Sequence, residues 1–142
     1  MTTINPDKFI RKAVYDQINA IVVSGKIINT YDSRLTGNAN KNEYVLFTAQ
    51  TKEVEKSTKC EYRWTTSLLI EIYTKTSSAG NSGSRLLLND IEQAIYTLLL
   101  PKLTVSGFQN LTQNITFENQ LETVTDTENI FRSFLRLNLT LI

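Results

Sequence analysis

The chain has 142 residues, a formal net charge of +1 at pH 7, no histidine and one cysteine. Its length predicts a single domain, residues 1–142, with one core, and the near-neutral charge gives no general attraction to nucleic acid or membranes. Without histidine, Ser-His-Asp and Cys-His catalysis and imidazole metal ligands are excluded. Cys60 alone can form neither an internal disulfide nor a cysteine zinc site.

The first residues and the apolar runs of the chain indicate where in the cell the protein is expected. The first residues do not form a signal peptide, because no basic start leads into an apolar stretch. No apolar run approaches the roughly 18–20 residues that span a bilayer. We therefore expect a soluble protein made in the cytoplasm, with no membrane partner.

The first predicted element is a helix over residues 6–24. Asn5 can cap it, Pro6 suits its first position and Gly25 is a natural stop. Its apolar stripe consists of Ile10, Val14, Ile18 and Ile21. This helical spacing predicts one face packed on a sheet.

Beyond the first helix, the sequence predicts strands separated by a polar loop. Residues 26–31 are compatible with a short strand, residues 32–42 are rich in turn formers, and a strand follows over residues 44–50. A longer strand over residues 60–73 alternates strictly, as in an antiparallel sheet covered on one side. Cys60 falls on the face predicted to be buried, which favours a core residue over a reactive thiol.

The length of the second long strand is unusual. Residues 60–73 at about 3.3 Å each span roughly 46 Å, whereas a compact domain of this size is about 37 Å across. The strand must therefore bend or project beyond the core. A projecting strand has an unpaired edge to which another chain can bind.

A loop over residues 75–84 leads into a second predicted helix, residues 84–100, which Pro101 ends. The Gly-rich part of the loop lacks the Gly-Lys-Ser/Thr ending of a phosphate-binding loop. The stripe that should lie on the sheet consists of Leu87, Leu88, Ile91, Ala94, Ile95, Leu98 and Leu99. Leu86, Tyr96 and Leu100 gather on the far side, where frayed ends or a neighbouring subunit would explain them.

The C-terminal part predicts a long β-hairpin. One strand has Leu111, Ile115, Phe117 and Leu121 on one face, and the other has Phe131, Leu135, Leu137, Leu139 and Leu141. In an antiparallel hairpin the residue numbers of each facing pair have the same sum. Both apolar sets are odd-numbered, so this sum is even if the two apolar faces coincide. A sum of 254 is favoured, because it places Glu122 opposite Arg132 and Glu118 opposite Arg136 on the outer face, with Phe117 opposite Leu137 and Ile115 opposite Leu139 inside.

No group of residues in the sequence indicates catalysis. The carboxylate pairs Glu53/Glu55 and Asp90/Glu92 have a two-residue spacing that does not by itself build an acid–base pair. We therefore expect no enzyme, no catalytic or metal-binding residue and no cofactor. The elements together predict an α+β fold: a mostly antiparallel sheet of about four long strands, two helices packed on one face and a long C-terminal β-hairpin.

The order of these elements resembles the tail terminator (tail completion) proteins of long-tailed phages and their relatives at the head–tail neck. The resemblance lies in the helix PDKFIRKAVYDQINAIV, the strand RWTTSLLIEIYTK followed by SRLLLNDIEQAIYTLLLP, and the last strand FRSFLRLNLTLI. It covers nearly the whole chain, but it is one of pattern and order. The Asn/Thr-rich C-terminal half departs from it and leaves room for a neck or ring protein of a short-tailed phage.

The resemblance implies a structural virion protein, assembled in the host cytoplasm, that forms a ring, a hexamer or larger, at the head–tail junction. Such a ring caps the tail tube or joins it to the connector. Its partners would be further copies of itself and other phage neck, connector and tail proteins, with non-specific proximity to DNA in the lumen.

Binding residues are expected mainly in loops on a rigid scaffold. The loops over residues 32–42 and 74–83 are the best candidates, and the interface residues predicted there and on the second helix are Arg34, Lys41, Asn81, Leu86, Tyr96 and Leu100. The alternative function is a small oligomeric ligand-binding or regulatory α/β domain without catalytic activity. A pocket lined by convergent polar groups would favour that alternative.

Overall fold

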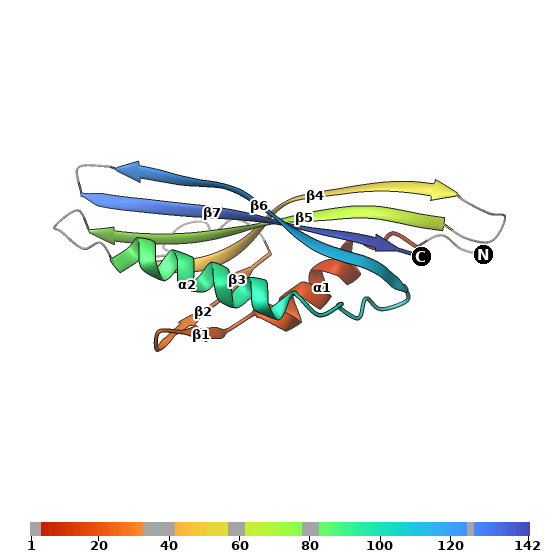
Figure 1. Cartoon of the computed structure of the whole chain (residues 1–142), viewed down its shortest axis with the longest axis horizontal. Helices are drawn as coiled ribbons and strands as arrows, with labels where there is room; N and C mark the ends of the chain where they lie inside the picture. The colour runs from red at the N-terminus through yellow and green to blue at the C-terminus, as the bar shows by residue number, and fades with distance from the viewer. Residues whose placement is uncertain (1–3, 33–41, 57–61, 78–82, 125–126) are drawn as a thin grey trace.

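The computed structural model describes residues 4–32, 42–56, 62–77, 83–124 and 127–142. They form an elongated body in which long strands run along the longest axis and both helices lie on the same side of the sheet (Figure 1). The elements are α1 (Asp7–Ile18), β1 (Ile21–Val23), β2 (Lys26–Ile28), β3 (Thr30–Tyr31), β4 (Glu43–Lys56), β5 (Tyr62–Ser77), α2 (Gly83–Leu98), β6 (Asn110–Val124) and β7 (Glu128–Leu141). The predicted α+β fold is confirmed, with four long strands and the C-terminal hairpin β6–β7.

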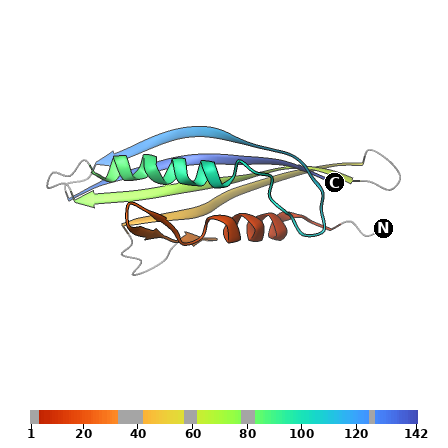
Figure 2. The same cartoon turned by 60° about the horizontal axis from the view of Figure 1, so that its bottom comes forward.

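The main sheet has five strands in the order β3-β4-β5-β7-β6, and β1 and β2 form a separate two-stranded hairpin. All pairs in the main sheet are antiparallel except β3–β4, which is parallel. β6 therefore forms one edge of the sheet. The other edge is β3 beside β4, with the β1–β2 hairpin on the same side of the molecule (Figure 2).

Helix α1 begins as predicted but ends early. The Asn5 side chain accepts a hydrogen bond from the Asp7 backbone N–H at 2.9 Å, and the buried stripe is Ile10, Val14 and Ile18. The prediction that the helix continues to residue 24 is wrong, because the chain leaves the helix at Asn19, whose backbone is extended, and Ala20 then has φ +59°. The β-branched run that follows has its χ1 freedom restricted in a helix and favours a strand.

The turn of the β1–β2 hairpin explains why this run can pair with the next one. Ser24 and Gly25 have φ values of +52° and +78°, as the two central residues of a type I′ turn require. Val23 then lies opposite Lys26, and Val22 opposite Ile27. The predicted short strand over 26–31 is present, divided into β2 and β3.

The two central strands are longer than the sequence pattern indicated. β4 continues to Lys56, well past the predicted end at residue 50, with an irregularity in its pairing to β5 between Phe47 and Gln50. β5 continues to Ser77, so the predicted loop begins three residues too early. Cys60 lies outside the described residues.

The core lies between the inner face of the sheet and the two helices. It is formed by the alternate residues of β5 from Trp64 to Ile72, those of β7 from Phe131 to Leu141, and the stripes of α1 and α2. Ile70, Ile72, Leu88 and Ile91 are at most 1% exposed. The sequence pattern of α2 correctly identified its buried side, and the observed bounds Gly83–Leu98 match the predicted range to within two residues.

The predicted register of the C-terminal hairpin is wrong. Ile115 faces Leu137 and Phe117 faces Leu135, so the sum of facing numbers is 252 rather than 254, and it becomes 253 beyond Phe117. The change occurs at an irregularity between Phe117 and Gln120, which adds a residue to β6 and reverses its alternation. Leu121 therefore lies opposite Arg132 on the face away from the helices.

Candidate functional site

The face of the sheet away from the helices, called here the outer face, has no helix over it among the described residues (Figure 1). On β5 and β7 it presents the residues that alternate with the core: Thr65, Ser67, Leu69, Glu71 and Tyr73 on β5, and Arg132, Phe134, Arg136, Asn138 and Thr140 on β7. Many of these side chains are only partly exposed. They cover one another through hydrogen bonds, ion pairs and ring contacts.

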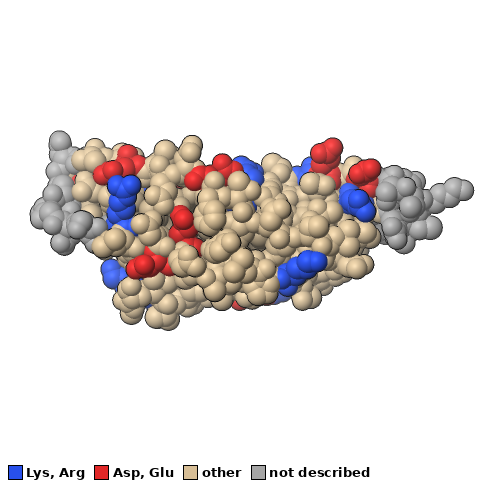
Figure 3. Space-filling model, viewed as in Figure 1, with Lys and Arg blue, Asp and Glu red and all other residues tan. Residues whose placement is uncertain are grey.

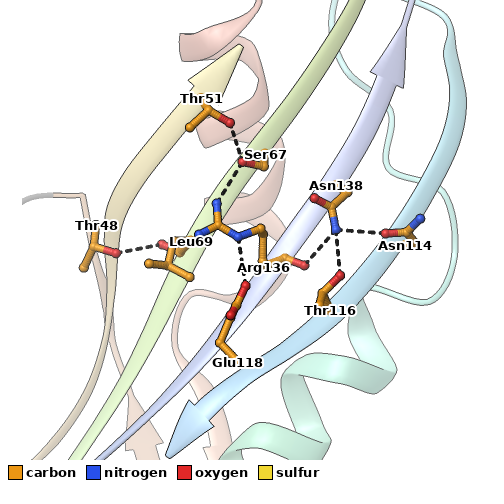
Figure 4. Close-up of polar contacts among 9 residues, drawn as sticks. All are labelled: Thr48, Thr51, Ser67, Leu69, Asn114, Thr116, Glu118, Arg136 and Asn138. Carbon is orange, nitrogen blue, oxygen red and sulfur yellow. Dashed lines mark hydrogen bonds and ion pairs between the residues drawn. The ribbon is translucent and has the colours of Figure 1, made fainter. Parts of the chain in front are cut away.

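A polar network crosses four strands at the middle of the outer face (Figure 4). Arg136 on β7 donates to Glu118 on β6 at 3.0 Å and to the Ser67 hydroxyl on β5 at 3.1 Å. The Ser67 and Thr51 hydroxyls lie 2.5 Å apart. Each of these groups already has a hydrogen-bond partner within the sheet. The network therefore stabilises the surface of the sheet and does not form a reactive site.

A second region of the outer face is aromatic. Tyr44 stacks on Tyr73 with ring centroids 4.6 Å apart, and Tyr31 meets Tyr44 edge-on at 6.1 Å. Beside them, Arg132 forms an ion pair with Glu71 at 3.4 Å. The row joins β3, β4 and β5, and such pairs stabilise a sheet through side-chain contact across strands.

Two open hollows lie on the described surface. One, of about 450 Å³, is on the outer face and is lined mainly by hydroxyl and amide side chains; in it, Asn138 donates to Asn114 at 2.9 Å. The other, of about 630 Å³, lies between α1 and β4, where Arg11 bonds Gln50 at 2.6 Å and pairs with Asp32 at 3.3 Å. In both, polar groups are engaged with one another, and no nucleophile with an adjacent base is assembled.

The described residues contain no group of three or more Cys, Asp or Glu side chains that could hold a metal ion. None of the described helices has the length and hydropathy needed to cross a membrane. On the face shown in Figure 3, acidic and basic side chains are interspersed across a largely uncharged surface. That face therefore shows no basic track of the kind that binds a nucleic acid backbone.

Large apolar side chains are exposed at both long edges of the molecule. On the β1–β2 hairpin, Val22 is 68% and Ile27 64% exposed, and the two lie opposite each other. On β6, Phe117 is 53%, Leu121 49% and Val124 67% exposed. We call the first pair the hairpin patch and the three β6 residues the β6 patch. The β6 patch extends over both sides of this edge, because Leu121 lies on the outer face whereas Phe117 and Val124 lie on the side of the helices.

Reasoning from the sequence missed both patches. It placed Val22 inside a helix and Leu121 on a buried face. Ser24-Gly25 between two short β-branched runs is a hairpin signal and could have identified the hairpin patch. The irregularity in β6 that turns Leu121 outward could not be predicted in the same way, because no turn-forming pair of residues marks it in this Asn- and Thr-rich strand.

The predicted interface residues do not form one patch. Leu86 and Leu100 are 66% and 57% exposed, but at 1.5 Å per residue they lie about 21 Å apart along the helix direction. Tyr96, between them, is partly buried against Phe117, with ring centroids 5.2 Å apart. Their role in an interface stays a prediction, and Arg34, Lys41 and Asn81 lie outside the described residues.

Comparisons with known proteins found a likeness in structure alone. No family model matches the chain, and no curated protein matches it. Among solved structures, a chain of the "Virion of native gene transfer agent (GTA) particle" has a similar fold, with a TM-score of 0.62 and 16% sequence identity. The similarity covers 97% of this chain and 99% of that one, so the two folds correspond from end to end.

Proposed function

We propose that this protein is a structural component of a phage-like virion and acts by binding other virion proteins rather than by catalysis. The observation that carries the proposal is the end-to-end similarity in fold to a chain of a gene transfer agent particle, which is itself phage-like. The similarity takes in nearly all of both chains.

Within the virion, we propose a place at the head–tail junction, as a tail terminator or neck adaptor that forms a ring. The order of elements, which resembles that of the tail terminator family, supports this assignment. The open edges of the long sheet and the exposed apolar residues beside them also support it, because a subunit in a ring needs two different contact surfaces. The ring would cap the tail tube or join it to the connector.

Electron microscopy of the purified protein, alone and mixed with tails lacking it, tests this function. We expect closed rings, and we expect them at one end of the tail tube. The assigned place is contradicted if the protein binds along the whole tube or to the capsid shell. The broader role in a virion is contradicted if antibodies against the protein find it in infected cells but not in purified particles.

A further inference from the structure

We propose that the last part of β6, residues Gln120–Val124, is a releasable strap that separates from β7 while the rest of the sheet stays folded. Its release would uncover the backbone edge of β7 from Asn129 to Ser133, which lies opposite it. We call Gln120–Val124 the strap and Asn110–Phe117 the fixed part of β6. This motion follows from the fold alone and does not depend on a role in a virion.

The side chains of the strap are less buried than those of the fixed part. Every residue of β6 from Thr116 to Val124 is exposed, on both faces of the strand. In the fixed part, Leu111, Gln113 and Ile115 are partly buried, and Ile115 packs against the core. A segment opens locally at low cost where few apolar contacts are buried and the backbone hydrogen bonds are near solvent. The strap therefore has little burial energy that resists its release.

The irregularity in the pairing of β6 with β7 lies directly before the strap. Phe117 faces Leu135, and Gln120 faces Ser133. Two residues of β6 therefore stand where β7 has only Phe134. An extra residue of this kind disrupts the ladder of backbone hydrogen bonds locally. Separation of the strap can thus stop at this point and leave the fixed part paired.

The strand β4 shows what holds a comparable segment in place. It too has an irregularity in its pairing, and beyond it Thr51–Glu55 is exposed on both faces. There Lys52 forms an ion pair with Asp7 of α1 at 2.5 Å, and the hydroxyls of Thr51 and Ser67 lie 2.5 Å apart. This segment of β4 is therefore tied both to a helix and to its neighbouring strand.

The strap has a weaker attachment. Among the described residues, its side-chain hydrogen bonds to α2 come from Gln120, whose amide bonds Asn89 at 3.1 Å and Glu92 at 3.3 Å. Exposed polar contacts of this kind contribute little to stability. Both lie at the first residue of the strap, so toward Val124 the strap is held mainly by its pairing with β7.

The strand β7 keeps its place when the strap leaves. From Asn129 to Ser133 it pairs with β5 on its other side, and Phe131 and Ser133 are 7% and 1% exposed. Over this length the strap therefore decides whether β7 is an inner strand or the edge of the sheet. An edge strand presents backbone groups to which a further strand can be added.

Native-state amide hydrogen exchange, followed residue by residue by NMR, tests the strap. We expect the strap amides that bond β7 to exchange at least about a hundredfold faster than the corresponding amides of Leu111–Ile115. The amides of Asn129–Ser133 that point toward β6 should exchange at the rate of the strap, because one opening exposes both. The alternate amides of these β7 residues point toward β5 and should stay protected.

Two glycine substitutions separate release of the strap from unfolding of the whole protein. Thr123 lies in the strap and Thr112 in the fixed part, and both are exposed. Glycine weakens a strand at either position, so both variants should speed the slowest amides of β5, which exchange through global unfolding. Thr123→Gly should also speed the strap amides about fivefold. Thr112→Gly should leave them unchanged, because Thr112 stays paired when the strap opens.

Three results overturn the inference. Exchange of the strap at the rate of the fixed part would show that β6 opens as a unit. Continued protection of the β7 amides that point toward β6 would show that the strap does not leave β7. Equal acceleration of the strap amides by Thr123→Gly and Thr112→Gly would show that the strap opens only when the whole protein unfolds. Fast exchange that responds to Thr123→Gly alone supports the release.

Discussion

The two faces of the main sheet are made by alternate residues of the same strands, yet they are stabilised in different ways. On the inner face, Leu68, Ile70 and Ile72 of β5 are at most 1% exposed and pack under the helices. On the outer face, Ser67, Leu69 and Glu71 have no helix above them and are covered by neighbouring side chains. The inner face thus holds the fold together, whereas the side chains of the outer face are covered by contacts with one another.

The largest expected effect on stability comes from comparing alanine substitutions at two adjacent positions of β5, one on each face of the sheet. Ile70→Ala should lower the free energy of unfolding by about 2–5 kcal/mol, because it opens a cavity under the helices. Leu69→Ala, the matched change on the outer face, should cost about 1 kcal/mol. Urea denaturation of both variants measures the difference, and equal losses would contradict the division between the faces.

A smaller effect is expected where a polar residue lies on the inner side. The amide of Gln113 donates to the carbonyl oxygens of Leu99 and Pro101 at 2.5 and 2.9 Å and accepts from the Leu103 N–H at 2.9 Å. It thereby ties the segment after α2 to β6. Gln113→Ala should cost about 2 kcal/mol in unfolding free energy, because several backbone groups lose their partner.

Gln120→Ala is the control for that change. Gln120 is exposed, and among the described residues its amide bonds side chains, those of Asn89 and Glu92, at 3.1 and 3.3 Å. Its loss should cost no more than about 0.5 kcal/mol. If the two glutamine variants unfold at the same urea concentration, Gln113 does not hold the segment as described.

The smallest effect is expected for the network of the outer face. The Arg136–Glu118 pair is partly exposed, with 31% and 38% of the two side chains accessible. A double-mutant cycle of Arg136→Met and Glu118→Gln should give a coupling energy below about 1 kcal/mol that falls as salt is added. A larger coupling, unchanged by salt, would show that this face contributes to stability as the inner face does.

The inner face was largely predictable from the sequence, and the edges were not. Strict alternation in β5 and β7 and the helical stripe of α2 identify residues such as Ile70, Leu137 and Ile91, because burial of apolar area dominates there. The end of α1 was missed because Ile21 continues the helical spacing. Only the turn at Ser24-Gly25 shows that the chain has changed direction.

The hairpin register shows a second limit. The Glu118–Arg136 ion pair was expected from a directly opposite placement, and it forms although Arg136 faces Thr116. A long arginine reaches a diagonal neighbour, so a charge pair does not fix a register. Arg132 was expected to pair with Glu122 and instead pairs with Glu71 of β5, because the added residue in β6 shifts Glu122 opposite Phe131.

The exposed apolar residues at the two edges could not be located from the sequence. The sequence excluded histidine-based chemistry and favoured an assembling protein. The edge patches depend on a turn and on an irregularity in β6 that the strand pattern did not reveal. Of the predicted interface residues, Leu86 and Leu100 are exposed, whereas Tyr96 is partly covered within the same chain.

The most direct test of the account is the mass of the wild-type protein in solution, measured by native mass spectrometry across a concentration series. A subunit with two different contact surfaces should build a closed assembly of about six copies, without a stable twofold dimer as the end point. That result would agree with a ring protein of the virion. A dimer that stays the largest species at every concentration would contradict head-to-tail association, because it would show a self-complementary contact.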